Sequence, residues 1–247
     1  MAIRGSADVA FVLLDGQDIL GTLTELTDTV EATIEDTTVL GAAWKAQFYT
    51  GVKTATLTQQ GFWDSAAGSI HDALSSGPGI SKVMSYGVEG TATGARVIGW
   101  EGAMQVNYQR LFPLGELFKA NANYQTNGNV DETKLLRTYK AAAATGRTTG
   151  APVDNAVSAT GGVAYLQYNA AAGEANFRVL HSSDNVTYAT LITFTKTDAT
   201  SAIHGAERIA TTAVVERYLA VDVTTATATG SIGAMNYMVS FGRGISA

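Results

Sequence analysis

The stretch that decides the fold of this chain is residues 51–74, GVKTATLTQQGFWDSAAGSIHDAL. Its first half alternates a valine and threonines with lysine, alanine, leucine and glutamine. β-branched residues at period two are typical of a strand that presents one face to a core and the other to polar surroundings. Two large rings, Phe62 and Trp63, follow at the exit of this strand. We therefore expect a strand that ends in an aromatic corner.

The second half of the same stretch predicts a short helix over residues 65–74. Asp64 or Ser65 suits its N-cap position, because both side chains can accept a hydrogen bond from the first turn. Ile70 and Leu74 lie four residues apart and share one apolar face. The anchors that we expect to hold this helix on the sheet are Phe62, Trp63, Ile70 and Leu74.

The composition is typical of a β-rich protein. Charged residues make up only 15% of the 247 residues, against about a quarter in globular chains generally. Threonine, alanine and glycine take their place, and a chain of this length holds one large β domain or two small ones. The N-terminal apolar run is too short for a signal-peptide core or a membrane span, so we expect no membrane association and a cytoplasmic site of synthesis.

Alternating runs predict strands along the whole chain. Residues 141–152 interrupt them with a small, polar, glycine-bearing segment that is typical of a linker. Beyond it, short strands with turn signals between them predict an antiparallel sandwich, either immunoglobulin-like or jelly-roll-like. We therefore divide the chain into a first β domain at 1–142, a linker at 143–152 and a second β domain at 153–247. The strands expected in the first domain, apart from the one in residues 51–74, cover 7–14, 19–34, 81–89, 95–106, 114–125 and 130–139.

The net charge of −6 is concentrated near the N-terminus. Residues 8–36 contain eight carboxylates and no basic residue. Such a surface repels a phosphate backbone rather than binding it. The alternative is a solvated strand edge that only keeps the protein soluble.

Large apolar residues crowd the segment 35–49, whose periodicity is weak. The four that matter most are Val39, Leu40, Trp44 and Phe48. They are too many for a loop left in water. Either they fold back on the core or they meet a partner subunit.

The chain shows no constellation of an enzyme, and we expect no catalytic residue, cofactor or metal site. It has no cysteine, which excludes disulfides, thiolate zinc sites and cysteine nucleophiles. Ser69, His71 and Asp72 are neighbours on one predicted helix and cannot converge on a reacting atom. The three histidines lack metal-ligand spacing.

Several tyrosines of the second half could line a sugar-binding face on a sandwich. The interpretation that we favour is packing in the core and at the rim of a small sheet. These residues are Tyr165, Tyr168, Tyr188, Tyr218 and Tyr237.

Nearly the whole chain resembles the tail tube (major tail) proteins of long-tailed bacteriophages. The first half carries the likeness in EDTT at 35–38, Trp44-Lys45, TLTQQGFWD at 56–64, GAMQVNY at 102–108 and GELFKANANYQ at 115–125. The second half resembles the outer sandwich domain of some of these proteins, in GGVAYLQ at 161–167, HSSDN at 181–185, ERYL at 216–219 and FGR at 241–243.

The resemblance implies a structural virion protein of a phage tail. Because an extra outward domain would crowd a surrounding sheath, we expect a non-contractile, siphovirus-type tail. Six subunits would form a ring, their inner strands would join into one barrel, and stacked rings would form the tube for genome ejection. It implies further partners: other tail proteins at the tube ends, a tape measure protein in the lumen, and DNA in transit. Val39, Leu40, Trp44 and Phe48 would then be ring-to-ring contacts. The residues that would form an acidic lumen or interface surface are Asp28, Glu31, Glu35 and Asp36.

A second function class remains open from the sequence. In it, the chain is a capsid or tail decoration protein or an adhesin, and its C-terminal sandwich binds a surface glycan. Tyr188 and Tyr218 would be the residues to test.

Overall fold

The computed structural model describes residues 5–40, 44–66, 69–141, 146–147, 153–154, 159–170, 173–195, 198–199, 203–224 and 235–244. Within these ranges the chain is built from antiparallel strands, one short α-helix and two 3₁₀ turns, η1 (Ser6–Asp8) and η2 (Leu20–Thr22). The prediction of a mainly β fold with one short helix is confirmed.

The chain forms two compact units. Unit 1 comprises Met1–Gly21, Lys82–Gly102 and Asn129–Ala247, and unit 2 comprises Thr22–Ser81 and Ala103–Gly128. Strand β6 (Arg96–Leu111) contributes its first half to unit 1 and its second half to unit 2. These units cut the chain at other positions than 142 and 153, and the predicted linker lies outside the described residues except for β9 (Gly146–Arg147). The division into a tube-forming and an outer domain stays a prediction.

Unit 1 is organised around one long antiparallel path of strands, β16-β11-β18-β8-β6-β5-β1-β2. Its longest ladder joins β11 to β16 and continues on the other side to β18. The bounds of these strands are β1 (Phe11–Leu14), β2 (Gln17–Asp18), β5 (Ser81–Gly87), β8 (Val130–Ala141), β11 (Ala159–Ala170), β16 (Ile203–Val215) and β18 (Met235–Arg243).

A second sheet, β10-β17-β13-β14 with β9 beside β17, covers one face of this path. Alternation along the strands decides which side chains enter the core between the two sheets. In β8, Leu136 joins that core while its neighbour Leu135 packs on the opposite face with Phe11 and Leu13. The remaining strands of unit 1 are β10 (Val153–Asp154), β12 (Gly173–Glu174), β13 (Asn176–Ser182), β14 (Ala189–Thr193), β15 (Asp198–Ala199) and β17 (Tyr218–Thr224).

The strand path of unit 1 closes on itself at the β1–β2 turn. Gly16 donates its N–H to Gln167 Oε1 at 2.7 Å, and Tyr139 donates its hydroxyl to the Gly16 carbonyl at 3.0 Å. Gly16 has φ +82, and a Cβ there would lie 2.0 Å from the Tyr168 carbonyl oxygen. Only glycine provides both that conformation and that close approach. The turn is thereby fixed against β11 and β16.

A buried ionic cluster joins four strands on the inner face of this path. Asp131 on β8 accepts hydrogen bonds from the Tyr165 hydroxyl at 2.5 Å and from Arg208 Nε at 2.8 Å. Arg208 also lies 3.5 Å from Glu101 on β6. Burial first, and then Asp131, raises the pKa of Tyr165, which keeps its hydroxyl protonated as a donor. A Cβ at Gly99 would meet the Tyr165 ring at 2.7 Å, so the ring needs a glycine beneath it.

Unit 2 is a four-stranded antiparallel arrangement in the order β3-β4-β7-β6. Its strands besides β6 are β3 (Leu23–Asp36), β4 (Gln47–Phe62) and β7 (Lys119–Thr126). Along β4, Ala55, Leu57, Gln59 and Gly61 are buried and the residues between them are exposed. The predicted one-sided strand is thus confirmed for 55–61, with the threonines on the exposed face.

Helix α1 (Ile70–Ser75) packs on this sheet. It is shorter than the predicted 65–74, and its N-cap is Ser69 rather than Asp64 or Ser65. The Asp64 backbone carbonyl accepts hydrogen bonds from Ser69 Oγ at 2.5 Å and from the His71 N–H at 3.3 Å. Ile70 and Leu74 are both fully buried, as their spacing predicts. Beneath the helix, Gln105 Nε2 donates to the Leu74 carbonyl at 3.0 Å.

Removing the acid of the ionic cluster tests whether it stabilises unit 1. Asp131→Ala leaves the Arg208 guanidinium buried without its main partner, so we expect the free energy of unfolding to fall by about 3–5 kcal/mol. Glu132→Ala is the control, because its exposed side chain pairs with Arg96 at the surface and should change stability by less than about 1 kcal/mol. Urea unfolding followed by tyrosine and tryptophan fluorescence measures both. Equal, small effects would contradict a stabilising role for the cluster.

Candidate interaction surface

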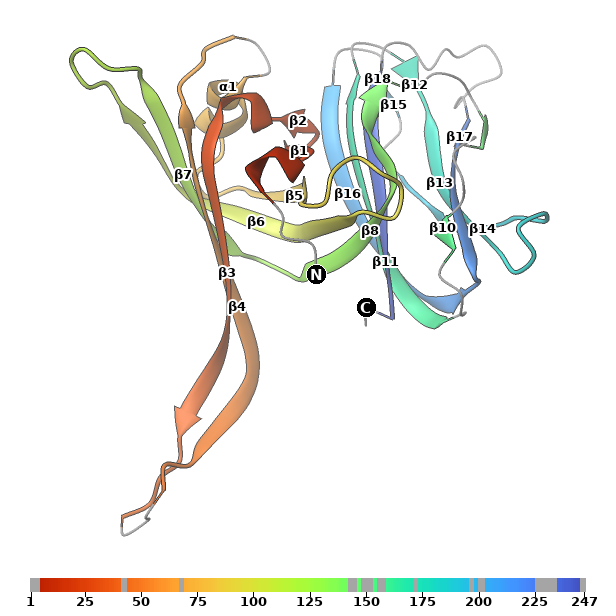
Figure 1. Ribbon diagram of the computed structural model, residues 1–247, viewed down its shortest axis with the longest axis horizontal. Coiled ribbons are helices and arrows are strands. Elements are labelled where there is room, and N and C mark those ends of the chain that lie inside the picture. The colour runs from red at the N-terminus through yellow and green to blue at the C-terminus, as the bar shows by residue number, and fades with distance from the viewer. Residues whose placement is uncertain are drawn as a thin grey trace. The chain divides into compact units, whose positions relative to one another are not determined.

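The β3–β4 hairpin extends beyond the rest of unit 2 as a two-stranded ribbon. β3 pairs with β4 from Leu23↔Gly61 to Asp36↔Gln47, whereas β7 pairs with β4 only from Thr56 to Phe62. None of the residues of β3 is buried. Figure 1 shows the two strands continuing together past the end of β7. A bare two-stranded hairpin is marginally stable in water, so this ribbon is a candidate for contact with another molecule.

The end of this ribbon carries the large apolar residues that the sequence singles out. Trp44 is 87% exposed, Val39 72% and Phe48 63%, and Leu40 is fully exposed. We call these four residues the hairpin tip. They do not fold back on the core, so that alternative is wrong. Their role as ring-to-ring contacts stays a prediction.

The predicted acidic residues lie along the same ribbon. Asp28, Glu31, Glu35 and Asp36 are all exposed on β3. Asp36 Oδ2 lies 3.6 Å from Lys45 Nζ across the hairpin, and hydrogen bonds from Thr38, followed by Lys45, lower the pKa of this carboxyl. β3 is also an edge strand, with β4 as its only partner among the described residues. The ribbon therefore offers an open edge as well as negative charge.

The other end of β4 forms the aromatic corner, which comprises Trp63, His71, Tyr108, Phe112 and Phe118. Trp63 lies 5.4 Å from the His71 ring, and 6.1 Å and 6.4 Å from the rings of Phe112 and Phe118, measured between centroids. His71 Nδ1 is 2.9 Å from the Tyr108 hydroxyl. Burial raises the pKa of Tyr108, and Arg110 and Trp63 partly oppose that rise.

The four predicted helix anchors have different environments. Ile70 and Leu74 are buried, Trp63 is half-buried in the corner, and Phe62 is 39% exposed. A Cβ at Gly61 would lie 3.1 Å from Ile70 Cδ1, so the helix approaches β4 closely at this glycine. Trp63 contacts helix α1 at the ring of His71, which lies in the first turn of the helix.

Sequence reasoning missed the apolar residues between β6 and β7. Residues 112–118, FPLGELF, form a turn rather than the start of a strand, and Gly115 has φ +78 within it. Leu114 is fully exposed, and Phe112, Leu117 and Phe118 are about half-exposed or more. The signal was present in the Pro113-Leu114-Gly115 sequence, which is typical of a turn.

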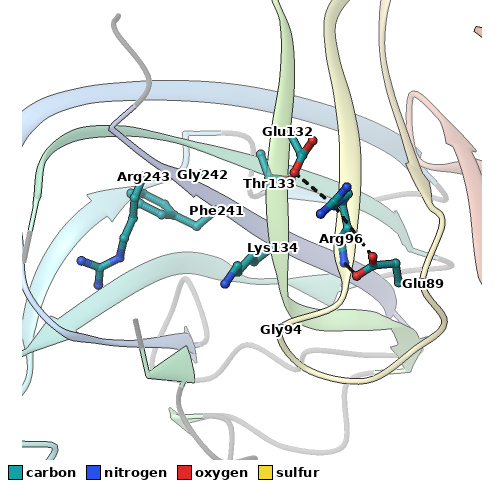
Figure 2. A pocket seen from close by; sticks show the side chains of 9 residues that line it. All are labelled: Glu89, Gly94, Arg96, Glu132, Thr133, Lys134, Phe241, Gly242 and Arg243. Atoms are coloured by element: carbon teal, nitrogen blue, oxygen red, sulfur yellow. Dashed lines mark hydrogen bonds and ion pairs between the residues drawn. The ribbon is translucent and has the colours of Figure 1, made fainter. Parts of the chain in front are cut away.

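A cavity of about 500 Å³ in unit 1 is lined by charged residues (Figure 2). Arg96 lies between two carboxylates, with Nε 3.0 Å from Glu132 Oε1 and 3.9 Å from Glu89 Oε1. Arg243 donates to the backbone carbonyls of Val215, Glu216 and Arg217. Both guanidinium groups already serve the protein's own acceptors, and we assign no ligand to this cavity.

The residues weighed for catalysis do not assemble into a triad. Ser69 Oγ donates to the Asp64 carbonyl, and His71 meets Tyr108. His181 and His204 lie on β13 and β16 of unit 1, and His71 lies on α1 of unit 2. In the part of the chain that the structure describes, no three His, Asp or Glu residues are grouped to hold a metal ion. None of the described helices is long and apolar enough to cross a membrane.

Packing accounts for three of the five tyrosines considered for sugar binding. Tyr165, Tyr168 and Tyr237 are buried, which confirms that interpretation for them. The other two are half-buried at the rim. The Tyr188 hydroxyl lies 2.5 Å from Asn185 Oδ1, and the Arg217 guanidinium covers the Tyr218 ring at 4.9 Å.

The chain matches no protein-family model and no curated protein. Among solved structures, it is similar to a chain of the tail of an empty gene transfer agent particle with C6 symmetry, at 14% identity, with a TM-score of 0.42 over 52% of this chain and 98% of that one. It is similar to a chain of a native gene transfer agent virion at 14% identity, with a TM-score of 0.41 over 53% of this chain and 99% of that one. It is also similar to the SPP1 Dit protein, described as a paradigm of the hub adsorption apparatus in phages that infect Gram-positive bacteria. That similarity is at 12% identity, with a TM-score of 0.33 over 95% of this chain and 99% of that one.

Two tryptophan truncations separate folding from surface contact. Trp63→Ala removes the ring that joins α1 to the β6–β7 turn, so we expect a loss of about 3 kcal/mol in the free energy of unfolding, near the lower end for buried aromatic residues. Trp44→Ala removes an exposed ring and should stay within about 0.5 kcal/mol of the wild type. Chemical unfolding of the unassembled protein measures both. A Trp63→Ala protein as stable as the Trp44→Ala protein would contradict the anchoring role.

Proposed function

We propose that this chain is a structural protein of a bacteriophage tail, which assembles into stacked hexameric rings that form the tube for genome ejection. The observation that carries the proposal is the bare β3–β4 ribbon, with an open strand edge along its length and an apolar tip at its end. A protein with such a feature completes its fold only by contact with another subunit. The sequence resemblance to tail tube proteins supplies the identity of the assembly.

The two features of the ribbon suit two directions of assembly. The open edge of β3 can pair with a strand of a neighbour in the same ring, which removes the unpaired edge. The hairpin tip extends along the strand axis and can contact the next ring, as a heterologous, open-ended interface requires. The carboxylates of β3 would keep passing DNA from binding to the wall. Tape measure and tube-end proteins are the further partners that this role implies.

Electron microscopy of the purified protein tests this proposal. We expect the wild type to form hollow tubes or six-fold rings. Leu40→Ala combined with Trp44→Ala should abolish stacking into tubes without unfolding the subunit, because both side chains are exposed in the single chain. The control is Val186→Ala, which removes an apolar side chain that is 78% exposed in unit 1 and should leave tubes intact. Tubes of normal length from the double variant would exclude the tip as the stacking contact, and a wild type that stays monomeric would exclude the tube.

A further inference from the structure

Unit 2 has a second exposed apolar surface, at the opposite end of β4 from the hairpin tip. We call it the turn patch, and it lies on the β6–β7 connection and the end of β4. Leu114 is fully exposed, Leu117 67% and Phe112 56%. Its members are Phe62, Phe112, Leu114, Leu117 and Phe118. Several large apolar side chains exposed on one turn and the adjoining strand end indicate an interaction site.

Two rings of the turn patch, Phe112 and Phe118, are held in place. The rings of Phe112 and Phe118 meet edge to face with centroids 4.7 Å apart, and both lie against Trp63. The backbone N–H of Trp63 donates to the backbone carbonyl of Phe118 at 2.9 Å, which ties the turn to the end of β4. Rings already held in place lose little conformational freedom on binding. The two rings are therefore a preorganised part of the turn patch.

The turn patch and the hairpin tip of one chain cannot meet. β4 runs from Gln47 beside the tip to Phe62 in the turn patch, and a strand of that length spans about 50 Å. Figure 1 shows the hairpin end and the β6–β7 connection at opposite ends of this ladder. Within one chain, therefore, neither surface can cover the other.

The charges flanking the two surfaces are complementary. Residues 28–48 carry four carboxylates and one lysine, and residues 108–119 carry two cations and one carboxylate. Lys119 lies 3.7 Å from Glu116 in its own turn, and the exposed Arg110 stands over the Tyr108 ring at 5.7 Å. Arg110 is thus placed to meet an acidic partner beside the apolar surface.

We propose that the turn patch is the receiving surface for the hairpin tip of a second copy of this chain. The inference rests on the proposed self-assembly and adds the counter-surface to it. A single head-to-tail contact covers both apolar ends of the ladder and brings the acidic ribbon of one copy to Arg110 of the next. Contact of the turn patch with itself would leave every hairpin tip exposed and would bring like charges together. The head-to-tail contact is open-ended, so it repeats from copy to copy.

Mixing two blocked variants tests this pairing. The tip-blocked variant is Leu40→Asp with Trp44→Asp, and the turn-blocked variant is Leu114→Asp with Leu117→Asp. All four positions are exposed, so both proteins should fold, which circular dichroism and unfolding curves check. Neither variant should stack alone. Mixed in equal amounts, they should form a species with twice the mass of either component and nothing longer, because one intact tip meets one intact turn patch.

Sedimentation velocity gives outcomes that support or overturn the inference. A doubled mass that appears in the mixture, and in neither variant by itself, supports the inference. A turn-blocked variant that stacks like the wild type, a tip-blocked variant that doubles by itself, or a mixture without a new species overturns it. The matched control, Val186→Asp with Val214→Asp, adds two charges at exposed valines of unit 1 and should stack as the wild type does.

The same data separate this inference from the proposed function. If the mixture of blocked variants doubles in mass but the wild type forms neither rings nor tubes, the head-to-tail contact is kept and the tail tube is rejected. Tubes from both the wild type and the turn-blocked variant would keep the tail tube and reject the turn patch as the receiving surface.

Discussion

A two-stranded ladder satisfies its own backbone hydrogen bonds between strands but leaves its faces and outer edges to the surroundings. That constraint governs unit 2. β7 pairs with β4 only from Thr56 to Phe62. Between Thr56 and the hairpin tip, the ribbon has exposed apolar residues on both strands, including Val30 and Ile34 on β3. Burying such side chains stabilises a fold by about 25 cal/mol per Å² of apolar area. In the assembly that we propose, a neighbouring chain supplies that stabilisation to the ribbon.

Unit 1 shows the opposite arrangement. Its strand path closes at Gly16, its ionic cluster is shared among four strands, and a second sheet covers its outer apolar face. The guanidinium groups of its charged cavity already have acceptors within the chain. Among the described residues, the large apolar side chains of unit 1 are mostly covered by its own strands, whereas the β3–β4 ribbon of unit 2 leaves its apolar side chains exposed.

The sequence predicted the strand and helix of residues 51–74 because local spacing determines them. Alternation fixed the one-sided burial of β4, and the i, i+4 pair fixed Ile70 and Leu74. It could not say which face of β4 is buried, since both faces carry residues that suit either side. It also read residues 114–118 as strand, because Leu117 and Lys119 continue the alternation of β7. The closure at Gly16 lay beyond prediction, as it depends on Gln167 more than a hundred residues away.

Hydrogen–deuterium exchange, compared between assembled and unassembled protein, tests the central claim most directly. If subunits complete the ribbon head to tail, amides of 28–40, 44–54 and 112–118 should all gain protection on assembly. The β13–β14 turn of unit 1, at 183–188, should exchange equally in both states. Assembled protein in which the hairpin and the 112–118 turn exchange as fast as in the single chain would contradict the account.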